Sequence, residues 1–157
     1  MKRFNVFFVL GMSLILSFTS CKKESKTVEK FVGTYSMTAT MNMSVIIDGE
    51  AYSIDPQTMK GYLTISKLDD GKRVVDIGDF YETTAIIDGN TIMLNSVQVS
   101  GRSASERYSE VLNINFQIGK LDGSTLNFDA ICTGTTYHEN GVAYPVVGTI
   151  THTAKKI

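Results

Sequence analysis

The sequence predicts an all-β domain, arranged as an antiparallel up-and-down meander. Residues 34–46 alternate apolar and polar side chains, which is the period-two pattern of a strand with one buried face. Asp-Gly or Asn-Gly pairs, which suit the positive φ angles of tight hairpin turns, occur at 48–49, 70–71, 88–89, 122–123 and 140–141. After residue 30 no segment has helical periodicity, apart from one helical turn that residues 55–60 could form.

The first strand is the longest, and it places Tyr35, Met37, Met41 and Met43 on one side. At about 3.3 Å per residue it would be roughly 40 Å long, so we expect it to bend and to serve two parts of a closing sheet. A later alternation, from Leu112 through Phe116 to Ile118, indicates another half-buried strand. Further strands are expected at 62–68, 74–80, 81–87, 91–100, 126–133 and 143–153.

Eight or nine consecutive strands of this kind can close into a barrel or stack as two sheets. Closure is favoured, because it removes exposed strand edges. Pro145 lies in the last strand and cannot donate to a strand ladder, so it prefers an edge or a bulge. The expectation is therefore a closed or nearly closed barrel, with a β-sandwich as the alternative.

Residues 1–20 have the pattern of a secretory signal peptide. A basic MKR start precedes an apolar stretch that ends at Phe18, and the run 6–18 is shorter than the roughly 20 residues that span a bilayer. The following Phe18-Thr19-Ser20-Cys21 resembles the lipobox of bacterial lipoprotein precursors, in the relaxed form frequent in Bacteroidetes-type bacteria. This resemblance implies cleavage before Cys21 and attachment of a diacylglyceryl group to its thiol. The alternative is an ordinary signal peptide cut near Ser20, with Cys21 as a bystander.

Lipidation of Cys21 would anchor the protein to a membrane, since two or more acyl chains hold durably where one does not. Residues 21–30, CKKESKTVEK, are too polar to fold alone and would form a short tether. The resemblance implies an outer-membrane lipoprotein of the cell envelope, and the sequence is compatible with either the periplasmic or the surface face.

The domain itself, residues 31–157, opens with Phe31-Val32-Gly33-Thr34-Tyr35. This segment resembles the F-x-G-x-W start of lipocalins and fatty-acid-binding proteins, the calycin group, with Tyr35 in place of Trp. The resemblance implies a barrel in which Gly33 turns the chain into the floor and Tyr35 plugs one end. Lipocalins pack an arginine of the last strand on that ring, but here no basic residue precedes Lys155 in the last strand.

Charge and cysteine content exclude some classes of protein. Without residues 1–20 the chain has thirteen basic and sixteen acidic residues, which gives a net charge of −3. The sequence has no basic stripe of the kind that binds nucleic acid. With Cys21 lipidated, Cys132 has no disulfide partner, and its phase with Leu126 and Phe128 predicts a buried, inert thiol.

The sequence offers little for catalysis or for a metal. His138 and His152 are expected at the surface, and no H-x-x-x-H or C-x-x-C spacing supplies the three or four ligands of a zinc site. The serines of the loop 101–107 lack the glycines of a nucleophile elbow. Asp69, Asp70, Asp76 and Asp79 are interpreted as solvated acids. We therefore expect neither enzymatic activity nor a cofactor.

The remaining candidate site is the inward face of the sheet. Methionine is flexible and polarizable and suits surfaces that accept variable apolar shapes. The expected function is the binding of a small apolar or amphipathic ligand, with the candidate residues Tyr35, Met37, Met41, Met43, Phe116, Phe128 and Tyr144. The alternative is an interaction module with a solid core that binds a protein or a glycan through loops such as 101–107, or through exposed tyrosines 52, 62 and 137.

If Cys21 carries the anchor, Cys21→Ser should move the protein from the membrane pellet to the soluble fraction. Cys132→Ser is the matched control and should leave it in the pellet. Ultracentrifugation followed by immunoblotting measures the distribution. A Cys21→Ser protein that still sediments with membranes would show that the anchor is assigned wrongly.

Overall fold

The computed structural model describes residues 28–67, 73–77, 81–102, 108–138 and 140–157. The expected signal peptide, Cys21 and most of the tether lie outside these residues, as do the turn at 70–71 and the loop 103–107. The chain divides into two compact units, Met1–Phe31 and Val32–Ile157, and the strands lie in the second. Within the described part no helix has both the length and the hydropathy to span a membrane.

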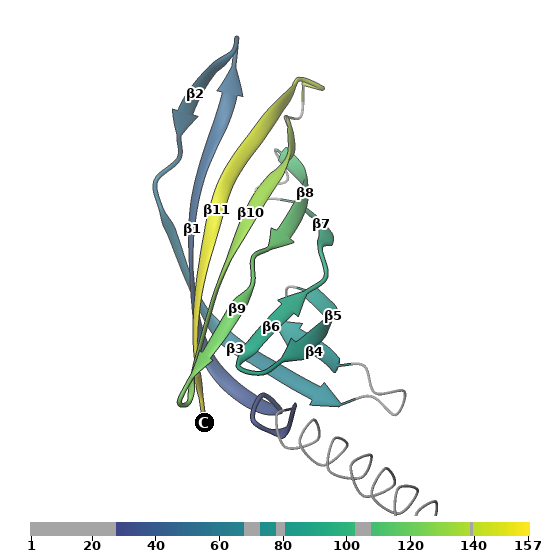
Figure 1. Cartoon of the computed structure of the whole chain (residues 1–157). Coiled ribbons are helices and arrows are strands. Elements are labelled where there is room, and N and C mark those ends of the chain that lie inside the picture. Colours follow the sequence, from purple (N-terminus) through teal and green to yellow (C-terminus); the bar gives the residue numbers. More distant parts are fainter. Residues whose placement is uncertain (1–27, 68–72, 78–80, 103–107, 139) are drawn as a thin grey trace, which may run out of the picture. The chain divides into compact units, whose positions relative to one another are not determined.

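Antiparallel strands make up the second unit, which confirms the predicted all-β, antiparallel class (Figure 1). In chain order they are β1 (Gly33–Ile47), β2 (Glu50–Ser53), β3 (Gln57–Lys67), β4 (Arg73–Ile77), β5 (Tyr81–Asp88), β6 (Thr91–Leu94), β7 (Val97–Arg102), β8 (Tyr108–Phe116), β9 (Gly119–Asp122), β10 (Thr125–His138) and β11 (Ala143–Lys156).

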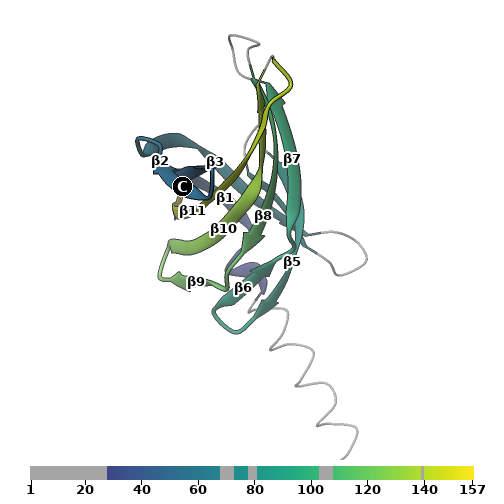
Figure 2. The same ribbon diagram turned by 90° about the horizontal axis from the view of Figure 1, so that it is seen from above.

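Three long strands, β1, β11 and β10, run side by side through the sheet (Figure 1). β11 pairs with β1 from Val146 to Lys156 and with β10 from Ala143 to Lys155. β1 also serves two partners on its other side, β2 near its end and β3 near its start, as its length predicted. The sheet is strongly curled (Figure 2).

The predicted strand through Ile118 is interrupted, and the prediction for this residue is wrong. β8 pairs with β10 as Phe116 with Ala130, whereas β9 pairs as Leu121 with Leu126, so the β8–β9 side contains one extra residue. Such a bulge shifts the side-chain phase to the other face. Ile118 is therefore 65% exposed, and Gly119 and Leu121 are buried instead.

The neighbouring segment, predicted as one strand over 91–100, breaks at the same level into β6 and β7. Asn95 and Ser96 form this break. Leu94 before it is buried and Val97 after it is half-buried, so the inward-facing residues change from even to odd numbers across the break. Two hydrogen bonds attach this break to β5. The Asn95 N–H donates to the carbonyl of Thr84 at 2.9 Å, and Thr83 Oγ1 donates to the carbonyl of Asn95 at 2.8 Å. The β6–β9 and β7–β8 pairings keep one common register across the two breaks.

The helical turn considered for residues 55–60 does not form, because β3 begins at Gln57. Gln57 pairs with Met41 and Lys60 pairs with Thr38, so tertiary pairing to β1 decides the local conformation. The turn predicted at Asp48-Gly49 is confirmed, with φ angles of 52° and 84°. Pro145 lies one residue beyond the register of β11 with β1, where its missing N–H breaks no pair with β1.

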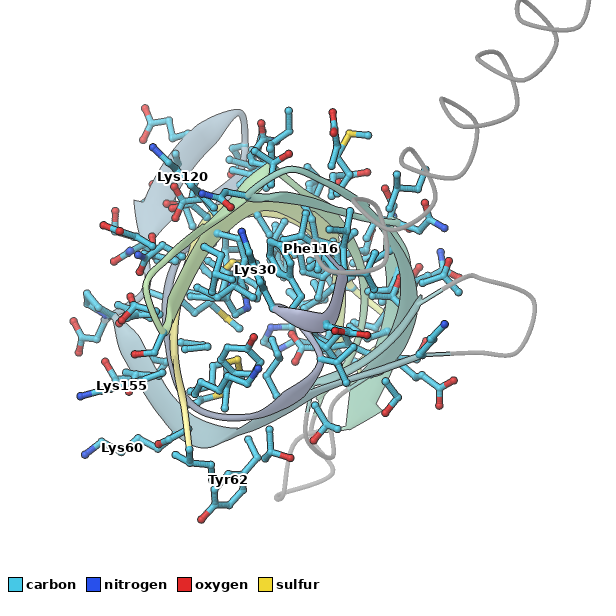
Figure 3. All side chains as sticks on the ribbon, turned by 60° about the horizontal axis from the view of Figure 1, so that its bottom comes forward. Lys30, Lys60, Tyr62, Phe116, Lys120 and Lys155 are labelled. Carbon is cyan, nitrogen blue, oxygen red and sulfur yellow. The ribbon has the colours of Figure 1, made fainter. Side chains whose placement is uncertain are left out.

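The inward face of the curled sheet carries the core. Phe116 points inward, whereas Lys60, Tyr62, Lys120 and Lys155 point away (Figure 3). Cys132 is 0% exposed and has no disulfide partner among the described residues, which confirms the predicted buried thiol. Among the sheet side chains whose burial is described, those that are fully buried are hydrophobic residues except His152.

Gly148 allows β11 to lie close against β1, opposite Met43. A Cβ there would collide with the Asn42 carbonyl oxygen and would lie 2.9 Å from Met43 Cα. We expect Gly148→Ala to lower the free energy of unfolding by about 2 kcal/mol or more, the usual cost of overpacking. Gly61→Ala in β3, where a Cβ meets nothing within 4 Å, is the control and should change it by less than about 1 kcal/mol. Urea unfolding measures both, and equal effects would contradict this packing argument.

Candidate functional site

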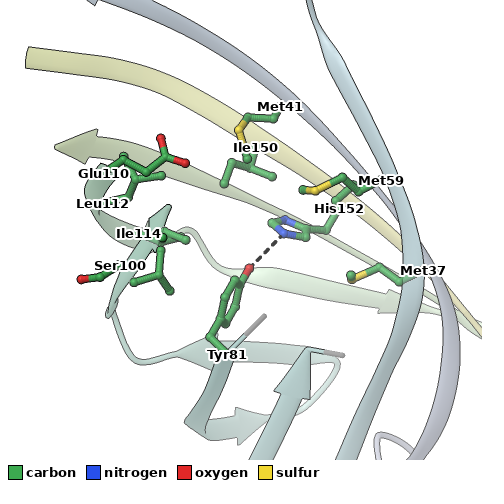
Figure 4. Close-up of a pocket in the computed structure, with 13 residues that line it drawn as sticks. Met37, Met41, Met59, Tyr81, Ser100, Glu110, Leu112, Ile114, Ile150 and His152 are labelled. Carbon is green, nitrogen blue, oxygen red and sulfur yellow. Dashed lines mark hydrogen bonds between the residues drawn. The ribbon is translucent and has the colours of Figure 1, made fainter. Parts of the chain in front are cut away.

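A cavity of about 310 Å³ lies on the inward face, and we call it the deep cavity (Figure 4). Its wall is formed by residues of β1, β3, β5, β7, β8 and β11. Along β1, β8 and β11 these are alternate residues, which the period of two points to the same side, whereas β7 contributes the consecutive residues 99–101. Most of this wall is apolar. The lining residues are Met37, Ala39, Met41, Met59, Tyr81, Val99, Ser100, Gly101, Glu110, Leu112, Ile114, Ile150 and His152.

His152 is the most unusual of these residues, because it is 1% exposed. One face of its ring stacks on Phe128, with centroids 4.3 Å apart and planes 8° from parallel. Its Nε2 lies 3.3 Å from the hydroxyl of Tyr81, within hydrogen-bonding distance. Its Nδ1 is buried and makes no hydrogen bond of normal geometry with the described residues, although the Phe128 backbone lies close enough to raise the pKa of the ring.

Burial also decides the charge of this site. It lowers the pKa of His152 to about 4, and the opposing effects of the Phe128 backbone and the Asp129 carboxylate do not offset it. Burial raises the pKa of the Tyr81 hydroxyl, with a smaller contribution from Cys132. Burial, followed by the charge of Glu110, raises the pKa of Cys132 to about 11. At neutral pH the imidazole, the phenol and the thiol are all uncharged.

A second cavity, of about 390 Å³, lies toward the β1–β2 and β10–β11 hairpins, and we call it the upper cavity. Met41, Glu110 and Leu112 line both cavities, so the two are neighbours along the inward face. The polar residues Asp55, Gln57, Thr136 and His138 join the apolar residues at the wall of the upper cavity.

Tyr35 lies toward the opposite end of β1 from the upper cavity and is 0% exposed. Lys156 pairs with Tyr35 across β1 and β11, and its Nζ lies 5.9 Å from the centre of the tyrosine ring, a cation–π distance. A Cβ on Gly33 would come 2.7 Å from Lys156 Cε, so the glycine leaves room for this side chain. No basic residue precedes Lys155 in β11, as the sequence shows, but Lys156 follows it and places a basic side chain over this ring.

The structure brings together part of the predicted site. Met37 and Met41 line the deep cavity and Met43 lines the upper one. Phe116 and Phe128 lie behind the cavity wall, with Phe116 6.2 Å and Phe128 4.3 Å from the His152 ring. Tyr35 and Tyr144 line neither cavity.

Three lining residues were not predicted from the sequence: His152, Tyr81 and Glu110. The surface position expected for His152 is wrong: it shares the buried phase of Ile150 and Ala154, and that phase was the available signal. His138 is exposed, as expected, and its ring contacts Tyr144 edge-on at 5.5 Å. Asp76 lies in β4, whereas Asp69, Asp70 and Asp79 lie outside the described residues. Among the described His, Cys, Asp and Glu side chains, no group of three or more is placed to hold a metal ion.

No protein-family model and no curated protein sequence matches the chain. Among solved structures, the chain is similar to the crystal structure of ywiB protein from Bacillus subtilis, with a TM-score of 0.29 and 10% sequence identity. The match covers 79% of this chain and 93% of that chain. A superposition this loose carries no information on function.

The depressed pKa of His152 makes stability depend on pH. Because the unfolded chain binds a proton near the ordinary pKa of 6.5 and the folded one only near 4, the contribution is complete above pH 6.5 and is lost as the pH falls toward 4. Between pH 7.5 and 4.5 the protein should lose on the order of 2 to 3 kcal/mol through this residue.

His152→Phe should remove this part of the loss, whereas His138→Phe at the exposed histidine should retain it. Urea unfolding at the two pH values gives the difference. If wild type and His152→Phe lose the same free energy on acidification, His152 is not buried as a neutral group.

Proposed function

We propose that this protein is a lipid-anchored, lipocalin-like β-barrel of the cell envelope that binds a small apolar or amphipathic ligand in its interior, without catalysis. The observation that carries the proposal is the deep cavity. Its volume of about 310 Å³ is at the lower end of the range usual for ligand sites, and a few polar groups are set in an apolar wall, as in such sites.

The strand pairings support a barrel over a sandwich. β11 pairs with both β1 and β10. On its other side β1 pairs with β3, and the pairings continue through β4, β5, β6 and β9 back to β10. A strand order that returns to its start in this way is typical of a closed up-and-down barrel. Tyr35 under Lys156 adds a second point of resemblance to lipocalins, an aromatic ring covered by a basic side chain of the last strand.

The alternative, an interaction module, predicted a solid core. The two cavities favour ligand binding over that alternative. Tyr52, Tyr62 and Tyr137 are exposed, but they lie on β2, β3 and β10, respectively. Anchoring through Cys21, a position in the outer membrane and the assignment of residues 1–20 as a signal peptide rest on the lipobox pattern.

The protein with Cys21→Ser, purified without detergent, should take up the neutral apolar dye N-phenyl-1-naphthylamine with a rise in fluorescence. Met41→Trp places a bulky ring at the wall shared by the two cavities and should reduce this uptake at least about tenfold, because overpacking leaves no room for the dye. Asn42→Trp, at the exposed neighbouring residue of β1, is the matched control and should bind as the parent does. Absence of uptake by the parent protein would overturn the proposed function.

A further inference from the structure

We propose that the ligand of the deep cavity is a neutral amphipath, whose hydroxyl or carbonyl group hydrogen-bonds to the His152–Tyr81 pair while its apolar part lies against the methionines of the wall. This inference rests on the proposed function and names the chemical class of its ligand. Met37, Met41 and Met59 point into the cavity around His152 (Figure 4), so an apolar chain that enters it would contact their thioethers.

The His152–Tyr81 pair can satisfy such a polar group in either of two arrangements. If the Tyr81 hydroxyl donates to Nε2, the pair offers a ligand the lone pairs of the phenol oxygen, because Nδ1 is buried. If Nε2–H donates to the phenol oxygen, the pair offers a ligand the phenol O–H as a donor. The Tyr81 hydroxyl therefore keeps an acceptor in the first arrangement and a donor in the second. A hydroxyl group is itself both donor and acceptor, and it can therefore match either arrangement.

A carboxylate fits this site poorly. Glu110 lies at the wall shared by the two cavities and Asp55 lines the upper one, so each cavity has a carboxylate at its wall that repels an anion. At the end of the deep cavity it would meet an uncharged imidazole and an uncharged phenol, and a buried charge without a counter-charge is costly. Among the described lining residues of both cavities there is no lysine and no arginine.

An ammonium group is also disfavoured at depth. The negative side chain available to it, Glu110, is exposed, and no described acidic group lines the deep cavity beyond it. A cationic amphipath would therefore hold its head group at Glu110, where water competes for it, and leave the His152–Tyr81 pair unmatched.

Four ligands with the same eight-carbon chain test this inference: 1-octanol, octanoate, octylammonium and octane. Each displaces N-phenyl-1-naphthylamine from the Cys21→Ser protein at pH 7.5. Octanol should bind at least about fivefold more tightly than each of the others, the factor that one well-placed hydrogen bond contributes. Tyr81→Phe and His152→Phe should each weaken octanol binding about fivefold and change octane binding less than twofold. Tyr62→Phe, at an exposed tyrosine, should change neither.

The outcomes separate this inference from the proposed function. If the protein takes up the dye but binds octanol and octane equally, the ligand makes no hydrogen bond to the His152–Tyr81 pair. The same follows if Tyr81→Phe does not weaken octanol binding. Either result contradicts this inference but leaves the proposed binding of an apolar ligand unaffected. Tightest binding of octanoate overturns the neutral class. If octylammonium binds most tightly and Glu110→Gln abolishes this binding, the polar contact is made at Glu110 and not at the His152–Tyr81 pair, and the inference is also wrong. If the parent protein takes up no dye, both proposals fall together.

Discussion

The structure depends on the pairing of β11 with a strand on each of its sides. β1 and β10 are far apart in the sequence, and each would leave a long open edge without β11 between them. The same pairings orient the inward residues of three strands toward one space, because side chains alternate strictly along each strand. Ile150 and His152 of β11 thus meet Met37 and Met41 of β1 in the deep cavity. The described residues that line the deep cavity all lie in strands.

Much of this sheet is legible in the sequence, since period-two alternation and turn dipeptides are local signals. They predicted the long first strand, its two partners, the buried Cys132 and the hairpin at Asp48-Gly49. The errors came where tertiary pairing overrode a local pattern. Ile118 was assigned to the core because its parity continues that of Phe116, but one extra residue against β10 reverses the phase. The start of β3 at Gln57 depends in the same way on pairing with β1.

The site was only half predictable, for a related reason. Met37, Met41 and Met43 were found because apolar residues on an inward parity signal a buried face. His152, near the end of the last strand, was placed at the surface, although its parity is that of Ile150. Tyr81 begins a strand, and only the curvature of the sheet brings it to within 3.3 Å of His152, which is 71 residues away in the chain. A polar pair of this kind leaves no spacing in the sequence.

The matched interruptions at 95–96 and 117–118 have a consequence for how such a chain can change in evolution. The β6–β9 pair and the β7–β8 pair have the same register, although an interruption lies between them on each side. Loss of one residue from one side alone would therefore shift the register of one pair by one residue relative to the other pair. Every inward side chain beyond that point would then face outward. Insertions and deletions at these two positions should therefore be inherited as a linked pair, although twenty residues separate them and neither contributes a side chain to the cavities.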